Sequence, residues 1–146
     1  MVMLCLLRFV AIVFGLFGHF YPVQEPSEAC KNVAYENRNQ TDYGPLRIVV
    51  VRGIVRDGQR VGIPNACVGV FTESDHKLVV ALETDGSGHF EVAGVPKGDY
   101  RLVVKYPGFC PANARVRVQA GTQRAKPLAV HMRPAGIDIC SYVDRK

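Results

Sequence analysis

Apolar and polar side chains alternate along most of the chain from residue 46 to residue 134. A period of two, with turn-forming residues about every 8–12 positions, is typical of the short strands in an all-β sandwich or barrel. No ten-residue stretch of this region has the helical period. We therefore predict an all-β fold, a seven-stranded antiparallel Greek-key β-sandwich. The predicted strands are 47–55, 66–71, 78–84, 89–92, 100–106, 114–119 and 126–132.

The alternation also predicts which side chains enter the core. In a sandwich of antiparallel sheets, each strand turns one face to the core and the other to water. We expect the last two strands to pair with each other through a turn at residues 120–122. The predicted core residues are Val51, Val55, Ala66, Val68, Val70, Leu82, Phe90, Val92, Tyr100, Leu102, Val104, Val116, Val118, Leu128 and Val130.

The first 21 residues contain no acidic side chain, and Arg8 is their one basic residue. The apolar run at residues 9–17 has the length of a signal-peptide hydrophobic region. A membrane span needs about 20 apolar residues, so this run alone is too short to cross a bilayer. We predict a signal peptide at residues 1–21, with a retained N-terminal anchor as the alternative. No clean cleavage box follows the apolar run.

The rest of the chain divides into three segments. Residues 22–45 are polar and have neither period, so we expect an irregular N-terminal arm. The predicted sandwich spans residues 46–134, and residues 135–146 form a C-terminal tail.

The five cysteines bear on the cellular compartment. Removal of the leader would remove Cys5 and leave an even number, which in a small exported domain predicts two disulfides. No two of these cysteines have the close spacing of a zinc ribbon or a C-x-x-C motif. Three pairings are open, and our working assignment joins the two tails. The candidate pairs are Cys30 with Cys140 and Cys67 with Cys110.

The net charge of +5 is unevenly distributed. Residues 22–100 carry 8 basic and 11 acidic side chains, whereas residues 101–146 carry 9 basic and 2 acidic ones. Arg115 and Arg117 alternate with inward valines, so both are expected to point outward. The predicted basic patch comprises Arg115, Arg117, Arg124, Lys126 and Arg133, with the last three placed on or beside the partner strand. Two interpretations stay open: contact with an anionic partner, and protection of an exposed strand edge.

Five short motifs occur in order along the predicted sandwich. They read Val51-x-Gly53-x-Val55-x-Asp57, Gly62-Ile63-Pro64-x-Ala66-x-Val68-x-Val70, Thr84-Asp85-x-x-Gly88-x-Phe90-x-Val92, Gly98-x-Tyr100-x-Leu102-x-Val104 and Gly108-Phe109. As an ordered set over residues 47–133, they resemble the carboxypeptidase regulatory-like domain. This family is a transthyretin-like, or prealbumin-like, β-sandwich related to bacterial surface B-type repeats. The resemblance implies that fold and, in general, a module without catalytic activity.

The turn residues of these motifs have structural explanations. Gly58 and Gly88 are expected at turns that a Cβ atom would strain. An aspartate at a turn accepts hydrogen bonds from the turn amides, and Tyr100 is expected to send its hydroxyl group to a nearby turn. The predicted structural turn residues are Asp57, Gly58, Asp85, Gly88, Gly98 and Tyr100.

Two enzyme families share the implied topology, and the sequence departs from both. Intradiol dioxygenases hold iron with two Tyr and two His, and no such paired signature surrounds His76, His89 or His131. Hydroxyisourate hydrolases end in Tyr-Arg-Gly-Ser, whereas this chain ends in Cys-Ser-Tyr-Val-Asp-Arg-Lys. His89 and Glu91 share one side of a strand and are expected to be a solvated pair. We predict that the protein is not an enzyme and that it uses no cofactor or metal.

These observations predict an exported, non-catalytic β-sandwich module for binding or structural interaction at the cell surface, in the periplasm or outside the cell. The expected partner is a protein or an anionic glycan of a cell-envelope surface. Nucleic acid is not expected, because the basic stretch 111–134 contains no aromatic residue. A membrane contact is expected only through an uncleaved N-terminal segment. The alternatives are a transthyretin-like small-ligand carrier and a small secreted hydrolase.

Overall fold

The computed structural model describes residues 30–36, 44–121, 126–136 and 140–145, and the predicted signal peptide lies outside them. Within these ranges the regular structure is carried by β-strands, which confirms the all-β prediction. None of the described segments forms a helix long and apolar enough to cross a membrane. The strands are β1 (Leu46–Ile48), β2 (Val51–Arg56), β3 (Cys67–Thr72), β4 (Leu78–Glu83), β5 (His89–Val92), β6 (Gly98–Lys105), β7 (Phe109–Cys110), β8 (Ala112–Val118), β9 (Leu128–His131), β10 (Arg133–Pro134) and β11 (Tyr142–Arg145).

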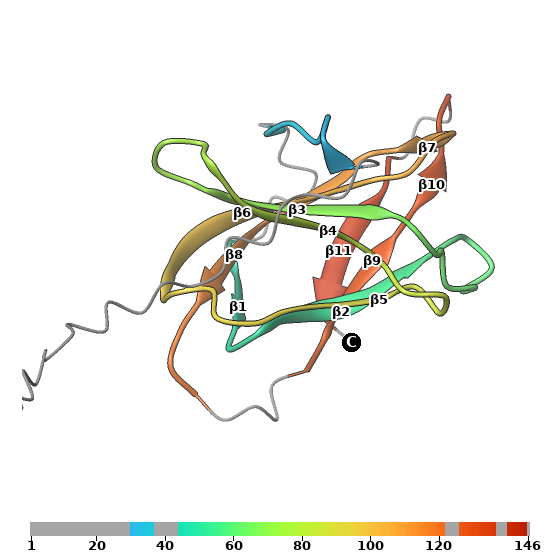
Figure 1. Cartoon of the computed structure of the whole chain (residues 1–146). Helices are drawn as coiled ribbons and strands as arrows, with labels where there is room; N and C mark the ends of the chain where they lie inside the picture. The colour runs from blue at the N-terminus through green and yellow to red at the C-terminus, as the bar shows by residue number, and fades with distance from the viewer. Residues whose placement is uncertain (1–29, 37–43, 122–125, 137–139, 146) are drawn as a thin grey trace, which may run out of the picture.

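Two sheets face each other across the core (Figure 1). The five-stranded sheet has the order β1-β8-β6-β3-β4, and the four-stranded sheet has the order β11-β9-β2-β5. A small third sheet pairs β7 with β10. All seven predicted strands are present, and the segment predicted as 47–55 is split into β1 and β2 by bends at Val49 and Val50.

The strand pairing differs from the prediction at two places. β8 and β9 do not form a hairpin, because they belong to opposite sheets. β8 instead pairs in parallel with β1, and β9 pairs in parallel with β2, so the sandwich is not antiparallel throughout. Alternation identifies the buried face of a strand but does not identify its neighbour.

The core lies between the two sheets and contains the predicted residues with one exception. Leu82 is half-buried and packs against the core from its rim, because β4 is an edge strand. The C-terminal tail contributes β11 to the four-stranded sheet, and Val143 of β11 is buried. The core also takes in Ile48, Ile63, Ala112, Ala114 and Met132.

The predicted turn contacts are present at three positions, Asp57, Asp85 and Tyr100. The Asp57 carboxylate accepts the backbone N–H groups of Gln59 and Val61, each at 2.9 Å. The Asp85 carboxylate accepts those of Ser87 and His89 at the same distance. The Tyr100 hydroxyl donates to the Pro96 carbonyl oxygen at 2.9 Å, and Gly98, the first residue of β6, lies against the Tyr100 ring.

The two glycines that were expected to relieve strain behave differently. Gly88 has a φ of +80°, and a Cβ atom there would lie 2.5 Å from the Val55 carbonyl oxygen. Gly58 has no positive φ and open space where its Cβ would lie, so the prediction is wrong for Gly58. In that turn it is Arg60 that adopts the left-handed conformation, with a φ of 69°.

Two disulfides are present, but their pairing corrects the working assignment. Cys30 is bonded to Cys67, and Cys110 is bonded to Cys140. Cys67 faces away from the core, beneath the N-terminal arm, whereas Cys110 ends β7 beside the C-terminal tail. Each disulfide therefore ties one flanking segment to the sandwich, rather than tying the two tails to each other.

Candidate functional site

Arm residues 30–36 cover part of the outer face of the five-stranded sheet, over β3 (Figure 1). Cys30 is bonded to Cys67 of β3, and the Val33 side chain packs over Gly69 two residues further along that strand. The Tyr35 ring meets the Phe71 ring edge-on, with centroids 5.9 Å apart. The arm therefore runs along β3 and excludes water from a face that was expected to be wet.

A buried ion pair lies beneath the arm. Arg101 of β6 is 2% exposed, and its guanidinium bonds both carboxylate oxygens of Glu73, at 2.6 and 3.1 Å. Burial by itself lowers the pKa of Arg101, but the Glu73 carboxylate and, to a smaller extent, Tyr35 more than offset this, so the pKa of Arg101 is raised. The guanidinium also lies 5.6 Å from the centre of the Tyr35 ring. Glu73 therefore holds Arg101, which in turn lies against Tyr35 of the arm.

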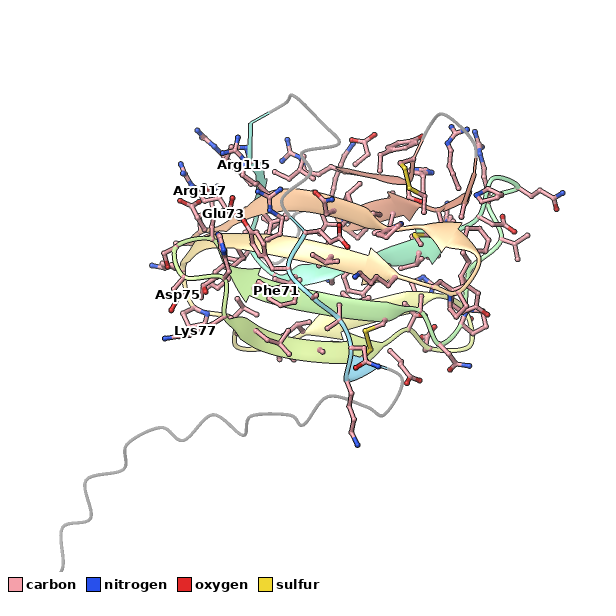
Figure 2. The ribbon with its side chains drawn as sticks, turned by 90° about the horizontal axis from the view of Figure 1, so that it is seen from above. Phe71, Glu73, Asp75, Lys77, Arg115 and Arg117 are labelled. Atoms are coloured by element: carbon pink, nitrogen blue, oxygen red, sulfur yellow. A yellow bond between two sulfur atoms is a disulfide. The ribbon has the colours of Figure 1, made fainter. Side chains whose placement is uncertain are left out.

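The two arginines predicted to point outward on β8 do so. Arg115 and Arg117 are exposed, whereas Val116 and Val118 are buried. Figure 2 shows both arginines near Glu73, at one end of the five-stranded sheet. Arg117 forms a two-pronged salt bridge with Asp99 at 2.6 and 3.0 Å, which lowers the pKa of that carboxyl.

Arg115 forms no ion pair within the described part of the chain, although its charge also contributes to the lowered pKa of Asp99. A cavity of about 110 Å³ opens between these groups. Its lining includes Pro45, Glu73, Asp99, Tyr100, Arg115 and Arg117.

Two further arginines join this cluster, and sequence reasoning missed both. Arg47 of β1 is exposed and aligned with Arg117 across the parallel β1–β8 pair, so the two side chains share one face. Arg145 of β11 donates from Nη1 to the Arg47 carbonyl oxygen at 3.2 Å. Alternation around Arg47 indicates that it faces outward, but no sequence signal places it beside β8. We call Arg47, Arg115, Arg117 and Arg145 the arginine end.

The remaining residues of the predicted basic patch do not line up with Arg115 and Arg117. Arg124 lies outside the described residues. Lys126 precedes β9, and Arg133 lies in β10, where its guanidinium is 5.9 Å from the centre of the Tyr142 ring. The prediction that Lys126 and Arg133 lie beside Arg115 and Arg117 is wrong, because β9 is a strand of the four-stranded sheet and does not pair with β8.

The three described histidines lie apart from one another. His76, in the β3–β4 turn, stacks on Tyr35 with ring centroids 3.8 Å apart. His131 of β9 stacks on Tyr142 at 4.6 Å, and burial lowers its pKa. His89 of β5 is exposed and lies 3.8 Å from the Asp85 carboxylate.

An open cavity of about 600 Å³ brings His89 together with acidic side chains. Its lining includes Arg52, Glu83, Asp85, His89 and Glu91. The carboxylate of Asp85 is already hydrogen-bonded to two turn amides, which lower its pKa. His89 and Glu91 are both exposed, as expected for a solvated pair. Within the described ranges, no group of three His, Cys, Asp or Glu side chains could hold a metal ion.

The geometry defines a class: a small β-sandwich domain whose two flanking segments are each held by a disulfide. The sequence profile of the carboxypeptidase regulatory-like domain matches residues 50–133, more than half of the chain. The chain belongs to this family, which confirms the resemblance seen in its motifs. No curated protein matches the sequence.

The solved structures that are similar to the chain include two enzymes. The 5-hydroxyisourate hydrolase of Klebsiella pneumoniae has a TM-score of 0.49 and 15% identity, over 69% of this chain and 95% of that one. The 3-chlorocatechol 1,2-dioxygenase of Rhodococcus opacus has a TM-score of 0.38 and 9% identity, over 70% of this chain and 63% of that one. Likenesses this distant carry no conclusion about activity.

Proposed function

We propose that this chain is a non-catalytic module of an exported protein and that its arginine end contacts an anionic partner. One observation carries the proposal. Arg47 and Arg115 form no ion pair within the described part of the chain, and they flank Arg117, which is paired with Asp99. Clustered positive charge at a surface attracts anionic groups over several ångströms and speeds their association. Acidic groups on a protein or on a cell-envelope glycan have the matching chemistry.

The absence of catalysis is supported by how the polar groups are used. Asp57 and Asp85 accept turn amides, and Glu73 is paired with Arg101. The described histidines lie on separate elements, and two of them are stacked on tyrosines. A general acid or base must reach the proton it transfers, and no nucleophile–base–orienter arrangement appears in these contacts.

Export is supported by the two disulfides. Such bonds persist in oxidising compartments and are rare in the cytosol. Cys30–Cys67 and Cys110–Cys140 are therefore consistent with an extracellular or periplasmic location. A signal peptide at residues 1–21 would provide the route.

The test measures binding of the full chain to heparin, used as a polyanion probe, at several salt concentrations. Reversal of both unpaired charges, Arg47→Glu with Arg115→Glu, is expected to weaken binding by about tenfold or more. It is also expected to reduce the dependence on salt. The matched control, Arg60→Glu with Lys126→Glu, changes the net charge equally at exposed sites elsewhere. Equal losses in both variants, or no binding by the parent chain, would overturn the proposal.

A small secreted hydrolase is the second candidate, favoured by the cavity that His89 shares with Glu83, Asp85 and Glu91. It predicts turnover of activated ester substrates that is lost in His89→Ala. The two candidate functions can be tested independently, because His89→Ala leaves the arginine end unchanged. Turnover that survives this substitution, or none at all in the parent chain, would remove the hydrolase.

A further inference from the structure

A second surface feature lies away from the arginine end, where β6 finishes. A groove of about 800 Å³ runs between the arm, the loop before β3 and the β6–β7 turn. This volume falls within the range of about 300–1,000 Å³ that is usual for small-molecule sites. We call it the aromatic groove, and its main lining residues are Asn32, Val33, Asn65, Lys105, Tyr106 and Phe109.

Two aromatic rings form one wall of the groove and are held in place. Tyr106 and Phe109 are half-buried, pack on the core with part of their surface, and have ring centroids 5.8 Å apart. The turn between them contains Gly108 at a φ of +82°, and the Phe109 N–H donates to the Tyr106 carbonyl oxygen at 3.1 Å. The wall is therefore formed before any ligand arrives, which reduces the ordering cost of binding.

The polar groups of the groove are available to a ligand. The side chains of Asn32, Asn65 and Tyr106 line it, and none of them hydrogen-bonds another described residue. The backbone of Asn65 is fixed by a hydrogen bond from its N–H to the Thr84 carbonyl oxygen at 3.1 Å. Each carboxamide offers both donors and an acceptor, and the phenol can do either.

Among the described residues that line the groove, the one charged side chain has a partner of opposite charge. The groove's one ionisable group besides Tyr106 is Lys105, whose ammonium lies 3.0 Å from the Glu36 carboxylate. An anionic ligand would have to break that ion pair to reach Lys105. The groove therefore favours a neutral ligand, whereas the arginine end favours an anionic one.

We propose that the aromatic groove binds a neutral saccharide. A sugar presents hydroxyl groups that donate and accept, which the carboxamides and the phenol match, and an apolar ring face that packs on aromatic side chains. A proline-rich peptide would also suit an aromatic wall, but its backbone offers mainly acceptors and would leave the carboxamide oxygens unsatisfied. The proposal rests on the proposed role as a binding module, and it assigns a ligand to a separate surface.

The experiment screens the full chain against immobilised neutral oligosaccharides of glucose, galactose, mannose and N-acetylglucosamine, and then titrates the best binder calorimetrically. Tyr106→Ala is expected to weaken binding by about tenfold or more. Asn65→Gly removes the carboxamide while tolerating the positive φ of 57° at that position, and it is expected to weaken binding similarly. Tyr106→Phe removes only the hydroxyl group, so it can replace Tyr106→Ala in the test if the alanine variant does not fold.

The arginine-end variant Arg47→Glu with Arg115→Glu is the matched control and should bind the saccharide unchanged. Conversely, Tyr106→Ala should bind heparin unchanged, so this proposal and the proposed function fail separately. Binding of no neutral saccharide, equal binding by the groove variants, or Tyr106-dependent binding of a proline-rich peptide would each overturn the assignment.

Discussion

The inner face of the five-stranded sheet and the part of its outer face on β3 and β6 are both buried, but by different means. The inner face meets the other sheet through aliphatic side chains such as Val68, Leu102 and Val104, all fully buried. The outer face is covered by a short arm held by a disulfide, an aromatic edge contact and the Lys105–Glu36 ion pair. Non-directional packing therefore secures one face, whereas a covalent tether and a few directional contacts secure the other. Substitutions on neighbouring residues of β6 can test this difference.

The largest effect is expected on the inner face. Leu102→Ala removes a fully buried side chain between the sheets and should lower the free energy of unfolding by about 2–5 kcal/mol. Chemical denaturation followed by circular dichroism measures this loss. A loss well below that range would mean that the inner face is no more demanding than the outer one.

The next effect concerns the tether. Cys30→Ala with Cys67→Ala removes a link across 37 residues and should lower the free energy of unfolding by about 2–4 kcal/mol. Because arm residues 30–36 contribute no strand to either sheet, we expect hydrogen exchange to show β6 still protected while the arm loses protection. Loss of protection throughout β6 would show that the sandwich itself depends on the tether.

A smaller effect is expected from Val103, the outer-face neighbour of Leu102. Val103→Ala removes two buried methyl groups and should cost about 1–2 kcal/mol. In the background lacking Cys30–Cys67 this cost should shrink, because the arm no longer covers the site, whereas the cost of Leu102→Ala should not change. Equal costs in both backgrounds would show that the arm stays docked without its disulfide.

Tyr100 tests a directional contact on the inner face. Tyr100→Phe keeps the buried ring but removes the hydrogen bond to the Pro96 carbonyl oxygen, at a cost of about 0.5–1.5 kcal/mol. Thermal unfolding of the two proteins measures the difference. A change of several kcal/mol would place this corner among the main supports of the inner face.

The smallest effect lies in the β3–β4 turn, which presents His76 to Tyr35 of the arm. The Thr72 hydroxyl and Lys77 lower the pKa of Asp75 from 3.8 to about 2. A lowered pKa stabilises the fold at pH values above the pKa of the unfolded carboxyl, and this contribution declines below about pH 4 and is lost as pH falls through about 2. Asp75→Asn should therefore destabilise slightly at pH 7, and the difference should be much smaller at pH 2. A difference that is independent of pH would exclude this role of the carboxylate.

Much of the sandwich can be predicted from the alternation of apolar and polar residues, because burial between two sheets imposes a period of two. The core positions from Val51 to Val130 follow that rule, and Leu82 departs from it only because β4 lies at an edge. The turn contacts of Asp57, Asp85 and Tyr100 are local and equally readable.

Burial on the outer face of the five-stranded sheet cannot be predicted from this alternation. Arg101 and Val103 occupy outward positions and are nevertheless buried, because a segment some seventy residues earlier lies over them. The arginine end depends likewise on the parallel pairing of β1 with β8, which brings Arg47 beside Arg117. The spacing of the cysteines likewise does not predict which of them are paired. Each of these features joins parts of the chain that are remote in sequence, and a periodic pattern contains no information about such partners.

The disulfides also determine what happens if the chain is cut. Cys30–Cys67 encloses the whole connection from the arm to β3, and Cys110–Cys140 encloses most of the C-terminal third. A protease that cleaves once inside either loop would leave both fragments covalently joined. The nicked protein would keep its full mass on a non-reducing gel and separate into fragments only after reduction. A single cut inside either loop would therefore not release the arm or the last strand.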